Sequence, residues 1–379
     1  MTEDIREKAG SFSCPSCGGR PTWNPARQNL HCPYCGSDIP VDMDHTAPAE
    51  YDIHTAPVGR ALDWGEETHV VRCEGCGAQT ILGKGESATR CAFCGSPHVL
   101  EDQSAAGIAP ESAIPFAVPQ ESAVSIFRKW LKGKLFAPAK AKKMAALGQI
   151  LGVYLPHWTY DSDTVSQYTG REGHYYYVTV PVRVNRNGKW VTEMRQERRI
   201  RWSPTSGVVS QVFDDVLIAG SERLPENQLA SVRPYDLGQL CRYQAAFLSG
   251  FSAEKASVDV QTGWTRAQAA IDRTMRDLAM RDILRHADEA QVTGIQSVHS
   301  NVRYKLTLLP MYLSSFGYKN KTYRVLVNGQ SGKCSGQSPV SALRVMIAVL
   351  LGLAVVFGLY WLFTGGGTAP AGTTTYVYY

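Results

Sequence analysis

Eight of the ten cysteines in this chain form four Cys-x-x-Cys pairs, and a glycine directly follows each pair. The pairs are Cys14/Cys17, Cys32/Cys35, Cys73/Cys76 and Cys91/Cys94. Fourteen residues separate the two pairs of each half, and the second half repeats the first at an offset of 59 residues. A Cys-x-x-Cys turn brings two thiolates onto one ion, and glycine takes the positive φ that aims backbone N–H groups at the sulfurs. The pattern predicts two tetrahedral sites of four thiolates each.

Zinc is the metal that a closed set of four thiolates suits best, so we expect two Zn²⁺ ions, one in each half of the repeat. Each half is then a zinc ribbon, a small domain held together by one metal ion. Iron in a rubredoxin-like site would use the same ligands and stays as the alternative. Disulfides are disfavoured, because we find no signal peptide and this spacing is typical of metal sites in a reducing compartment. Four protein ligands leave no open position for water, so the sites are expected to be structural or binding sites, not catalytic ones.

Three further residues bear on the metal sites. His31 stands beside Cys32 and could replace a sulfur, but we expect the four cysteines to complete the site. Cys241 and Cys334 are far apart in the sequence and lack a neighbouring His/Asp pattern, which favours inert thiols. We expect Cys14→Ser or Cys91→Ser to unfold its own ribbon while the membrane span still inserts.

The stretch Val345–Phe363 contains 19 residues without a charge or a proline. A helix of this length, at about 1.5 Å per residue, just spans a hydrocarbon core of roughly 30 Å. A buried core helix is the alternative, but such a helix normally has a polar face. We therefore expect a single-pass transmembrane helix over residues 343–363, with Tyr360 and Trp361 at the membrane interface.

The orientation of the span follows from the charges around it. Five basic residues precede it, and no charged side chain follows it: Lys319, Lys321, Arg324, Lys333 and Arg344. By the positive-inside rule, the long N-terminal part should lie in the cytoplasm, on the inner face of the cell membrane. The short remainder, residues 364–379, is expected to be a tail, so that the protein is tail-anchored.

Composition limits what the rest of the chain can be. Its 379 residues, 44% hydrophobic and 19% charged, suffice for two ribbons and one domain of ordinary size. The net charge of +5 is mild and does not by itself indicate a nucleic-acid binder. We expect zinc ribbon 1 at residues 1–40, a linker at 41–60, zinc ribbon 2 at 61–100, a loop and basic helical segment at 101–150, and an α+β domain at 151–335.

The basic helical segment has seven lysines and arginines and no acidic residue between Ser122 and Ile150. Apolar residues such as Phe127, Trp130 and Leu131 recur at helical spacing until Pro138 interrupts the pattern. One interpretation is a surface that binds phosphates, in lipid or in nucleic acid. The interpretation we favour is two ordinary helices with solvated lysines.

The α+β domain is expected to contain antiparallel strands. Strand patterns at 175–184 and 189–202 flank Asn187-Gly188, a dipeptide typical of β-hairpin turns. The second strand carries four arginines and two tryptophans; this mixture favours the solvated face of a sheet over a nucleic-acid surface. A helix is predicted over 264–287, with Ile271, Met275 and Leu278 on its apolar face. A second turn is expected at Asn328-Gly329.

These residues together resemble a family of bacterial zinc-ribbon membrane proteins, often labelled primosomal-protein-N′-like or superfamily II helicase-like. Besides the cysteine knuckles, the matching stretches are Gly152–Gly170, Phe247–Lys255 and Leu308–Lys333, so the resemblance covers nearly the whole chain. Members vary in having a membrane segment at the C-terminal end. The resemblance implies a recruiting role, because some relatives occur beside SPFH-domain and PspA-like envelope-stress proteins.

The helicase label fails against the residues themselves. A helicase motor needs a phosphate-binding G-x-x-x-x-G-K-[ST] loop, and Gly329–Lys333 has the wrong spacing and is followed by Cys334. G-x-S-x-G and H-E-x-x-H are also absent, so no enzyme is expected. We expect a non-enzymatic adaptor that docks protein partners at the membrane. A membrane-tethered nucleic-acid binder is the alternative.

Overall fold

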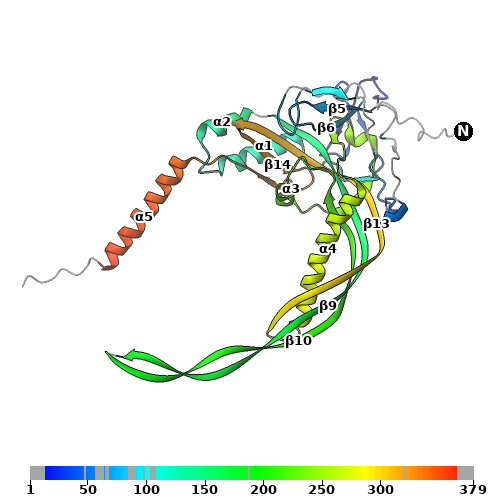
Figure 1. Ribbon diagram of the computed structural model, residues 1–379. Helices are drawn as coiled ribbons and strands as arrows, with labels where there is room; N and C mark the ends of the chain where they lie inside the picture. The colour runs from blue at the N-terminus through cyan, green and yellow to red at the C-terminus, as the bar shows by residue number, and fades with distance from the viewer. Residues whose placement is uncertain are drawn as a thin grey trace, which may run out of the picture.

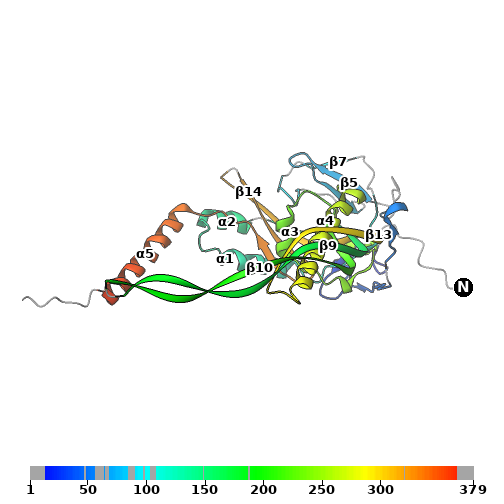
Figure 2. The ribbon, with the colours of Figure 1, turned by 60° about the horizontal axis from the view of Figure 1, so that its bottom comes forward.

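The computed structural model of the protein describes residues 13–46, 48–55, 64, 68–83, 90–96, 99–102, 108–147, 149–186, 188–319 and 321–364. The expected tail lies outside these residues from position 365 onward, and so does Asn187 of the expected hairpin turn. A sheet-rich body carries two projections, a curved pair of long strands and a C-terminal helix (Figure 1). In both views the free ends of these projections lie on the same side of the body (Figure 2).

Three long antiparallel strands dominate the sheet: β9 (Ile150–Arg186), β10 (Lys189–Ala219) and β13 (Glu289–Tyr318). Strand β9 pairs with β13 only from Ile150 to Gly173, whereas its pairing with β10 continues to Arg186. The distal residues 174–186 and 188–201 therefore form a two-stranded extension, which we call the arm. The two strands flank Gly188, whose φ of +82° suits glycine, so the predicted hairpin is confirmed with strands much longer than expected.

The long strands bend around helix α4 (Val260–Ile283), which lies in their hollow (Figure 1). Irregularities in β10, between Phe213 and Val216, and in β13, between Ser300 and Arg303, both lie opposite the same part of β9, and bulges of this kind bend a sheet. Helix α4 begins at an N-cap, where Asp259 accepts a 2.9 Å hydrogen bond from the Thr262 N–H. It therefore starts four residues before the predicted helix. The predicted apolar face is confirmed, with Ile271 and Met275 buried.

Short strands extend the same sheet on both sides. Its order is β11-β8-β13-β9-β12-β6-β5-β7, and β4, β10, β14 and β15 pair at the side of this path. The bounds are β4 (Tyr51–Asp52), β5 (Thr68–Cys73), β6 (Gln79–Gly83), β7 (Val99–Asp102), β8 (Ser112–Ala113), β11 (Cys241–Arg242), β12 (Ser252–Glu254), β14 (Lys321–Asn328) and β15 (Cys334–Gly336). The expected turn after β14 is present, because β14 and β15 pair antiparallel. Strands β5 to β7 carry the second cysteine group, so that group belongs to the main sheet.

The first cysteine group has a separate three-stranded sheet, formed by β1 (Thr22–Asn24), β2 (Asn29–His31) and β3 (Asp38–Ile39). The segment 41–60, expected as a linker, instead contributes β4, which pairs with β13, and a short 3₁₀ helix with the buried Ile53. Its residues 47 and 56–60 lie outside the described part of the chain. The strand pairing and the buried Ile53 make the described part of this segment a part of the body.

The remaining helices are α1 (Gln120–Lys132), α2 (Ala139–Leu147), α3 (Glu226–Val232) and α5 (Ala342–Thr364). The 3₁₀ helices are η2 (Ile53–Thr55), η3 (Leu237–Gln239) and η4 (Ala245–Leu248). Helix α5 is long and apolar enough over Ala342–Phe363 to cross a membrane, and its most apolar part buries no side chain against the body. Two cysteine clusters, an antiparallel sheet with helices, and one apolar C-terminal helix together confirm the expected fold class.

Candidate metal centres

The four Cys-x-x-Cys turns have the same backbone geometry. In each, the N–H of the following glycine donates to the carbonyl of the first cysteine at 2.7 to 2.9 Å. The four glycines, Gly18, Gly36, Gly77 and Gly95, have φ between +71° and +76°. A residue with a side chain would be strained at such a φ, so glycine permits the turn that directs both thiols toward the metal site. The turn geometry that the sequence predicts is therefore present in all four Cys-x-x-Cys turns, which we call knuckles.

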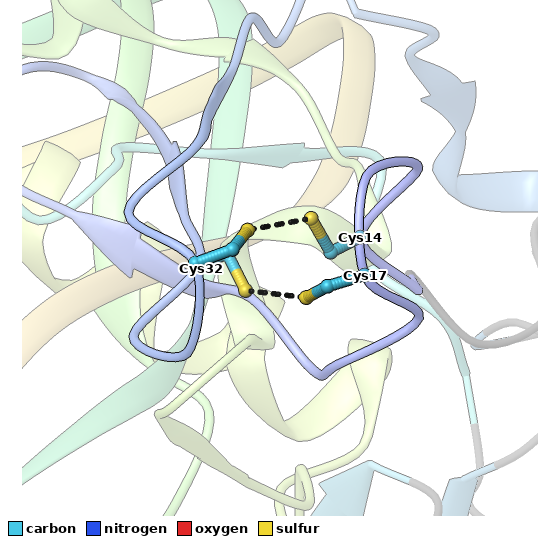
Figure 3. A group of neighbouring side chains, drawn as sticks. Cys14, Cys17 and Cys32 are labelled. Carbon is cyan, nitrogen blue, oxygen red and sulfur yellow. Dashed lines mark hydrogen bonds between the residues drawn. The ribbon is translucent and has the colours of Figure 1, made fainter.

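The structure brings the first four cysteines together. Cys14 Sγ lies 3.5 Å from Cys35 Sγ, and Cys17 Sγ lies 3.5 Å from Cys32 Sγ (Figure 3). All four sulfurs lie within 4.8 Å of one another. A tetrahedral ion with metal–sulfur bonds of about 2.3 Å places its sulfurs about 3.8 Å apart, so the cluster has the size of such a site. A disulfide would need about 2.05 Å, which excludes S–S bonds here.

The second four cysteines form a matching cluster. The distances are 3.6 Å from Cys73 Sγ to Cys94 Sγ and 3.6 Å from Cys76 Sγ to Cys91 Sγ. In both clusters each close contact joins a cysteine of the first knuckle to one of the second. This crossed arrangement is what a single ion held between two facing turns requires. The donor sets thus fit two metal ions with four thiolate ligands each.

His31 takes another role. Its Nδ1 lies 2.7 Å from Asp38 Oδ1, within a surface pair that Arg27 also joins. This histidine bond is the main reason that the pKa of Asp38 lies below its ordinary range. The four sulfurs form the first cluster without His31.

Ribbon 1, the sheet β1–β3 with its two knuckles, packs on the body around Trp23, and Leu30 belongs to the same buried hydrophobic core. Trp23 is buried, its Nε1 donates to the Phe116 carbonyl at 3.1 Å, and its ring meets the edge of Phe247 at 5.2 Å. The outer cysteines Cys17 and Cys35 remain exposed. The cysteine cluster of ribbon 1 is therefore open to solvent at these two positions.

Ribbon 2, the strands β5–β7 with their two knuckles, is held by one arginine on each knuckle. Arg223 donates from both terminal nitrogens to the carbonyls of Cys76 and Gly77, at 2.8 Å each. Arg324 Nε donates to the Phe93 carbonyl at 2.7 Å. Charged donors on carbonyls make strong hydrogen bonds in a half-buried setting. The second cluster is thus built into the body and not merely attached to it.

The two other cysteines lie apart from both clusters. Cys241 is buried and directs its thiol to the Ala113 carbonyl at 3.3 Å, and burial raises its pKa to about 12. Cys334 is half-buried, and burial raises its pKa to about 11. Both thiols therefore stay protonated near neutral pH, which is the state of an unreactive cysteine.

A third polar cluster was not found from the sequence, because its members come from distant segments. Glu50, Asp161 and Asp215 bring their carboxylates within 4.8 Å of one another at the bend of the long strands. The buried ammonium of Lys305 lies among them, 2.9 Å from Glu50 and 2.7 Å from Asp215. Lys305 thus occupies the place that a cation would take, and we interpret the cluster as a structural ion-pair joint at the bend.

The chain is similar to one protein of Bacillus subtilis (strain 168), described as the uncharacterized protein YdjG. The two are 26% identical over 372 residues, which cover 94% of this chain and 99% of that protein. The similarity thus extends well beyond the cysteine-rich part. No family model matches the chain, and no solved structure matches it.

Proposed function

We propose that this protein is a non-enzymatic docking protein that holds partner proteins at the cytoplasmic face of the cell membrane. In this proposal α5 is the single membrane span, and zinc occupies both thiolate clusters. The lysines and arginines before α5 support a cytoplasmic position for the body, by the positive-inside rule. The resemblance drawn from the sequence adds the candidate partners, SPFH-domain or PspA-like proteins of the envelope-stress response.

The observation that carries the proposal is a contrast at one position of the repeat. Tyr34 and Phe93 both precede the last cysteine of their ribbon, and they are 59 residues apart like the cysteines. Phe93 is 1% exposed, because it packs into the body, whereas Tyr34 is 77% exposed. Tyrosine offers a large apolar area and a polar hydroxyl at low entropic cost, which makes it a frequent anchor of protein interfaces. Ribbon 1 therefore presents an aromatic side chain on a rigid metal knuckle.

The hollow beside the second cluster has no acid–base side chains among its described lining residues. This hollow, about 350 Å³, is lined by Leu151, Leu313 and Phe316 together with the knuckle that begins at Cys91. Its polar lining side chains include Arg90 and Gln149, and its described lining has no carboxylate or histidine. General acid–base chemistry uses such groups at hydrogen-bonding distance from a substrate.

The experiment is affinity capture of the full-length protein from its native membrane in mild detergent, with and without nuclease. We expect a membrane-stress protein of the SPFH or PspA-like kind to co-purify in both samples. Tyr34→Ser should lose that partner, while Val212→Ser, at an exposed apolar position of β10, should retain it. Retention of the partner by Tyr34→Ser would remove the role proposed for ribbon 1.

The alternative, nucleic-acid binding, has its own supporting observation on the arm. Arg198 lies over the ring of Tyr175 at 4.3 Å, and Arg201 lies over that of Tyr176 at 5.4 Å. Exposed arginines and aromatic rings are the groups that bind phosphates and stack on unpaired bases. In this case, binding of single-stranded DNA or RNA should weaken steeply with salt, and the co-purifying proteins should disappear with nuclease.

A further inference from the structure

The connection between α1 and α2 is joined directly to the first turn of α5. The Ser341 N–H donates to the Phe136 carbonyl at 2.9 Å. Arg344 Nη1 donates to the carbonyls of Leu135 and Ala137, at 3.0 and 2.7 Å. Figures 1 and 2 both show α1 and α2 beside the end of α5 that joins the body. We call residues 128–144 the α1–α2 corner.

This attachment fixes the level of the corner relative to a membrane. Arg344 directly precedes the uncharged stretch Val345–Phe363, whose 19 residues have the length of the hydrocarbon core. A guanidinium at this point lies at the headgroup level, since charged groups at the ends of a span remain in the interface. Because Arg344 bonds to two carbonyls of the corner, the corner lies at the headgroup level as well.

The exposed side chains of the corner suit the headgroup region of a membrane. Leu135 is 75% exposed and Phe136 is 44% exposed, at the tip that Arg344 holds. Phe127 and Leu131 of α1 are buried against the body, and so is Ala141 of α2, so the opposite faces of both helices are turned outward. Those outward faces carry basic side chains, listed here in chain order: Arg128, Lys129, Lys132, Lys140 and Lys143.

Charge decides between possible ligands. Residues 120–147 contain seven basic side chains and one acidic side chain, Glu121. Apolar tips surrounded by lysines are typical of surfaces that insert into anionic bilayers, where the lysines meet phosphate groups. A nucleic acid would satisfy the lysines, but it would leave Leu135 in water at a site already held against the membrane.

We propose that the α1–α2 corner binds the headgroups of anionic phospholipids in the leaflet where α5 begins. The proposal rests on α5 being a membrane span, which is part of the proposed function. In it, Leu135 and Phe136 enter the bilayer interface, and the outward lysines of α1 and α2 contact lipid phosphates. The corner then adds a second contact between the body and the membrane, besides the span itself.

The test is hydrogen exchange of the full-length protein in lipid nanodiscs of phosphatidylcholine alone or with 40% phosphatidylglycerol as probe. We expect amide exchange in residues 128–144 to slow about fivefold with the anionic lipid, since bound segments open less often. Lys140→Glu/Lys143→Glu should abolish this difference. Arg273→Glu/Arg281→Glu, an equal charge reversal at exposed positions of α4, should preserve it.

Leu135→Ser/Phe136→Ser supplies a second variant that leaves the backbone carbonyls of the corner unchanged, and it should lose at least half of the protection. Equal exchange of the corner in the two lipids, or protection that survives Lys140→Glu/Lys143→Glu, would overturn the proposal. So would protection that appears in detergent when RNA is added and not with anionic lipid. Carbonate extraction of native membranes separates this from the anchoring itself: release of the whole protein would instead refute the span.

Discussion

The two ribbons have the same cysteine spacing and nearly the same sulfur geometry, yet they are connected to the body differently. Ribbon 1 keeps its own three-stranded sheet, packs on the body with Trp23 and Leu30, and leaves Cys17 and Cys35 exposed. Ribbon 2 shares the main sheet through β6 and β12, and Arg223 and Arg324 hold its knuckles. A local motif therefore specifies how a metal is bound, but it does not specify what depends on that metal. We expect the ribbon 1 metal to organise a binding surface and the ribbon 2 metal to stabilise the body.

Removing one ligand from ribbon 2 should have the largest effect. Cys91→Ser is expected to destabilise the body by at least about 5 kcal/mol, because structural zinc contributes a large part of the folding energy of such a site. Thermal unfolding and hydrogen exchange of the purified full-length protein would measure this. Exchange should rise in β12 and α3 as well as in β5–β7, and unchanged exchange in β12 and α3 would contradict the coupling.

The junction between ribbon 2 and the body should also depend on pH. Glu254 of β12 pairs with Thr80 of β6, is buried, and accepts a 2.5 Å hydrogen bond from Ser221. Burial raises its pKa from 4.5 to about 7, against the favourable Ser221 bond and the charge of Arg223. The folded state therefore holds this proton more tightly than the unfolded state, so stability falls as pH rises from about 4.5 to about 7.

Glu254→Gln should remove this contribution, since a neutral side chain has no charge to desolvate. The variant is expected to gain up to about 3 kcal/mol relative to the wild type above pH 7, and little at the acidic end. Denaturant unfolding between pH 4.5 and pH 8 would measure the difference. The half-buried carboxyl of Asp161, whose pKa burial also raises to about 7, is present in both proteins and cancels. Parallel pH curves for the two proteins would disprove the assignment to Glu254.

The arginine clamps on ribbon 2 should have a smaller effect. Arg324→Ala removes the donor to the Phe93 carbonyl, and we expect a loss of about 2 kcal/mol, the scale of a charged hydrogen bond to a half-buried acceptor. Its matched control is Arg27→Ala in ribbon 1, where the partner Asp38 is a surface carboxylate. That exposed pair should contribute less than about 0.5 kcal/mol. Equal losses of unfolding free energy in the two variants would contradict the proposed difference between the ribbons.

The metal of ribbon 1 should affect the body less than the metal of ribbon 2. Cys14→Ser is expected to unfold residues 13–39 locally and to destabilise the main sheet less than Cys91→Ser does, because ribbon 1 packs on the core with Trp23 and Leu30 but shares no strand with the main sheet. Elemental analysis should show one zinc per chain in this variant and two in the wild type. A collapse of protection in β9 or β13 would show that ribbon 1, too, is part of the folding unit.

The sequence predicted the local features well, because each depends on residues a few positions apart. The eight thiolates, their glycine turns, the hairpin around Gly188, the apolar face of α4 and the uncharged C-terminal helix all follow from spacing and residue type. The boundaries were less accurate: the strand expected at 175–184 is only the distal end of β9, which begins at Ile150. Its proximal half alternates less clearly, since both of its faces are buried there.

Tertiary structure alone decided how these parts are used. Phe93 and Tyr34 have equivalent sequence contexts, and only the chain that packs over ribbon 2 buries one and leaves the other in solvent. Lys305 meets Glu50 across 255 residues of sequence, a pairing that no local pattern contains. The physical reason is that a metal knuckle is closed by hydrogen bonds within six residues, whereas burial depends on segments that folding brings from far along the chain. The sequence therefore determined which groups can bind a metal and which helix is apolar enough to span a membrane, and the fold determined which side chains are buried and which are exposed.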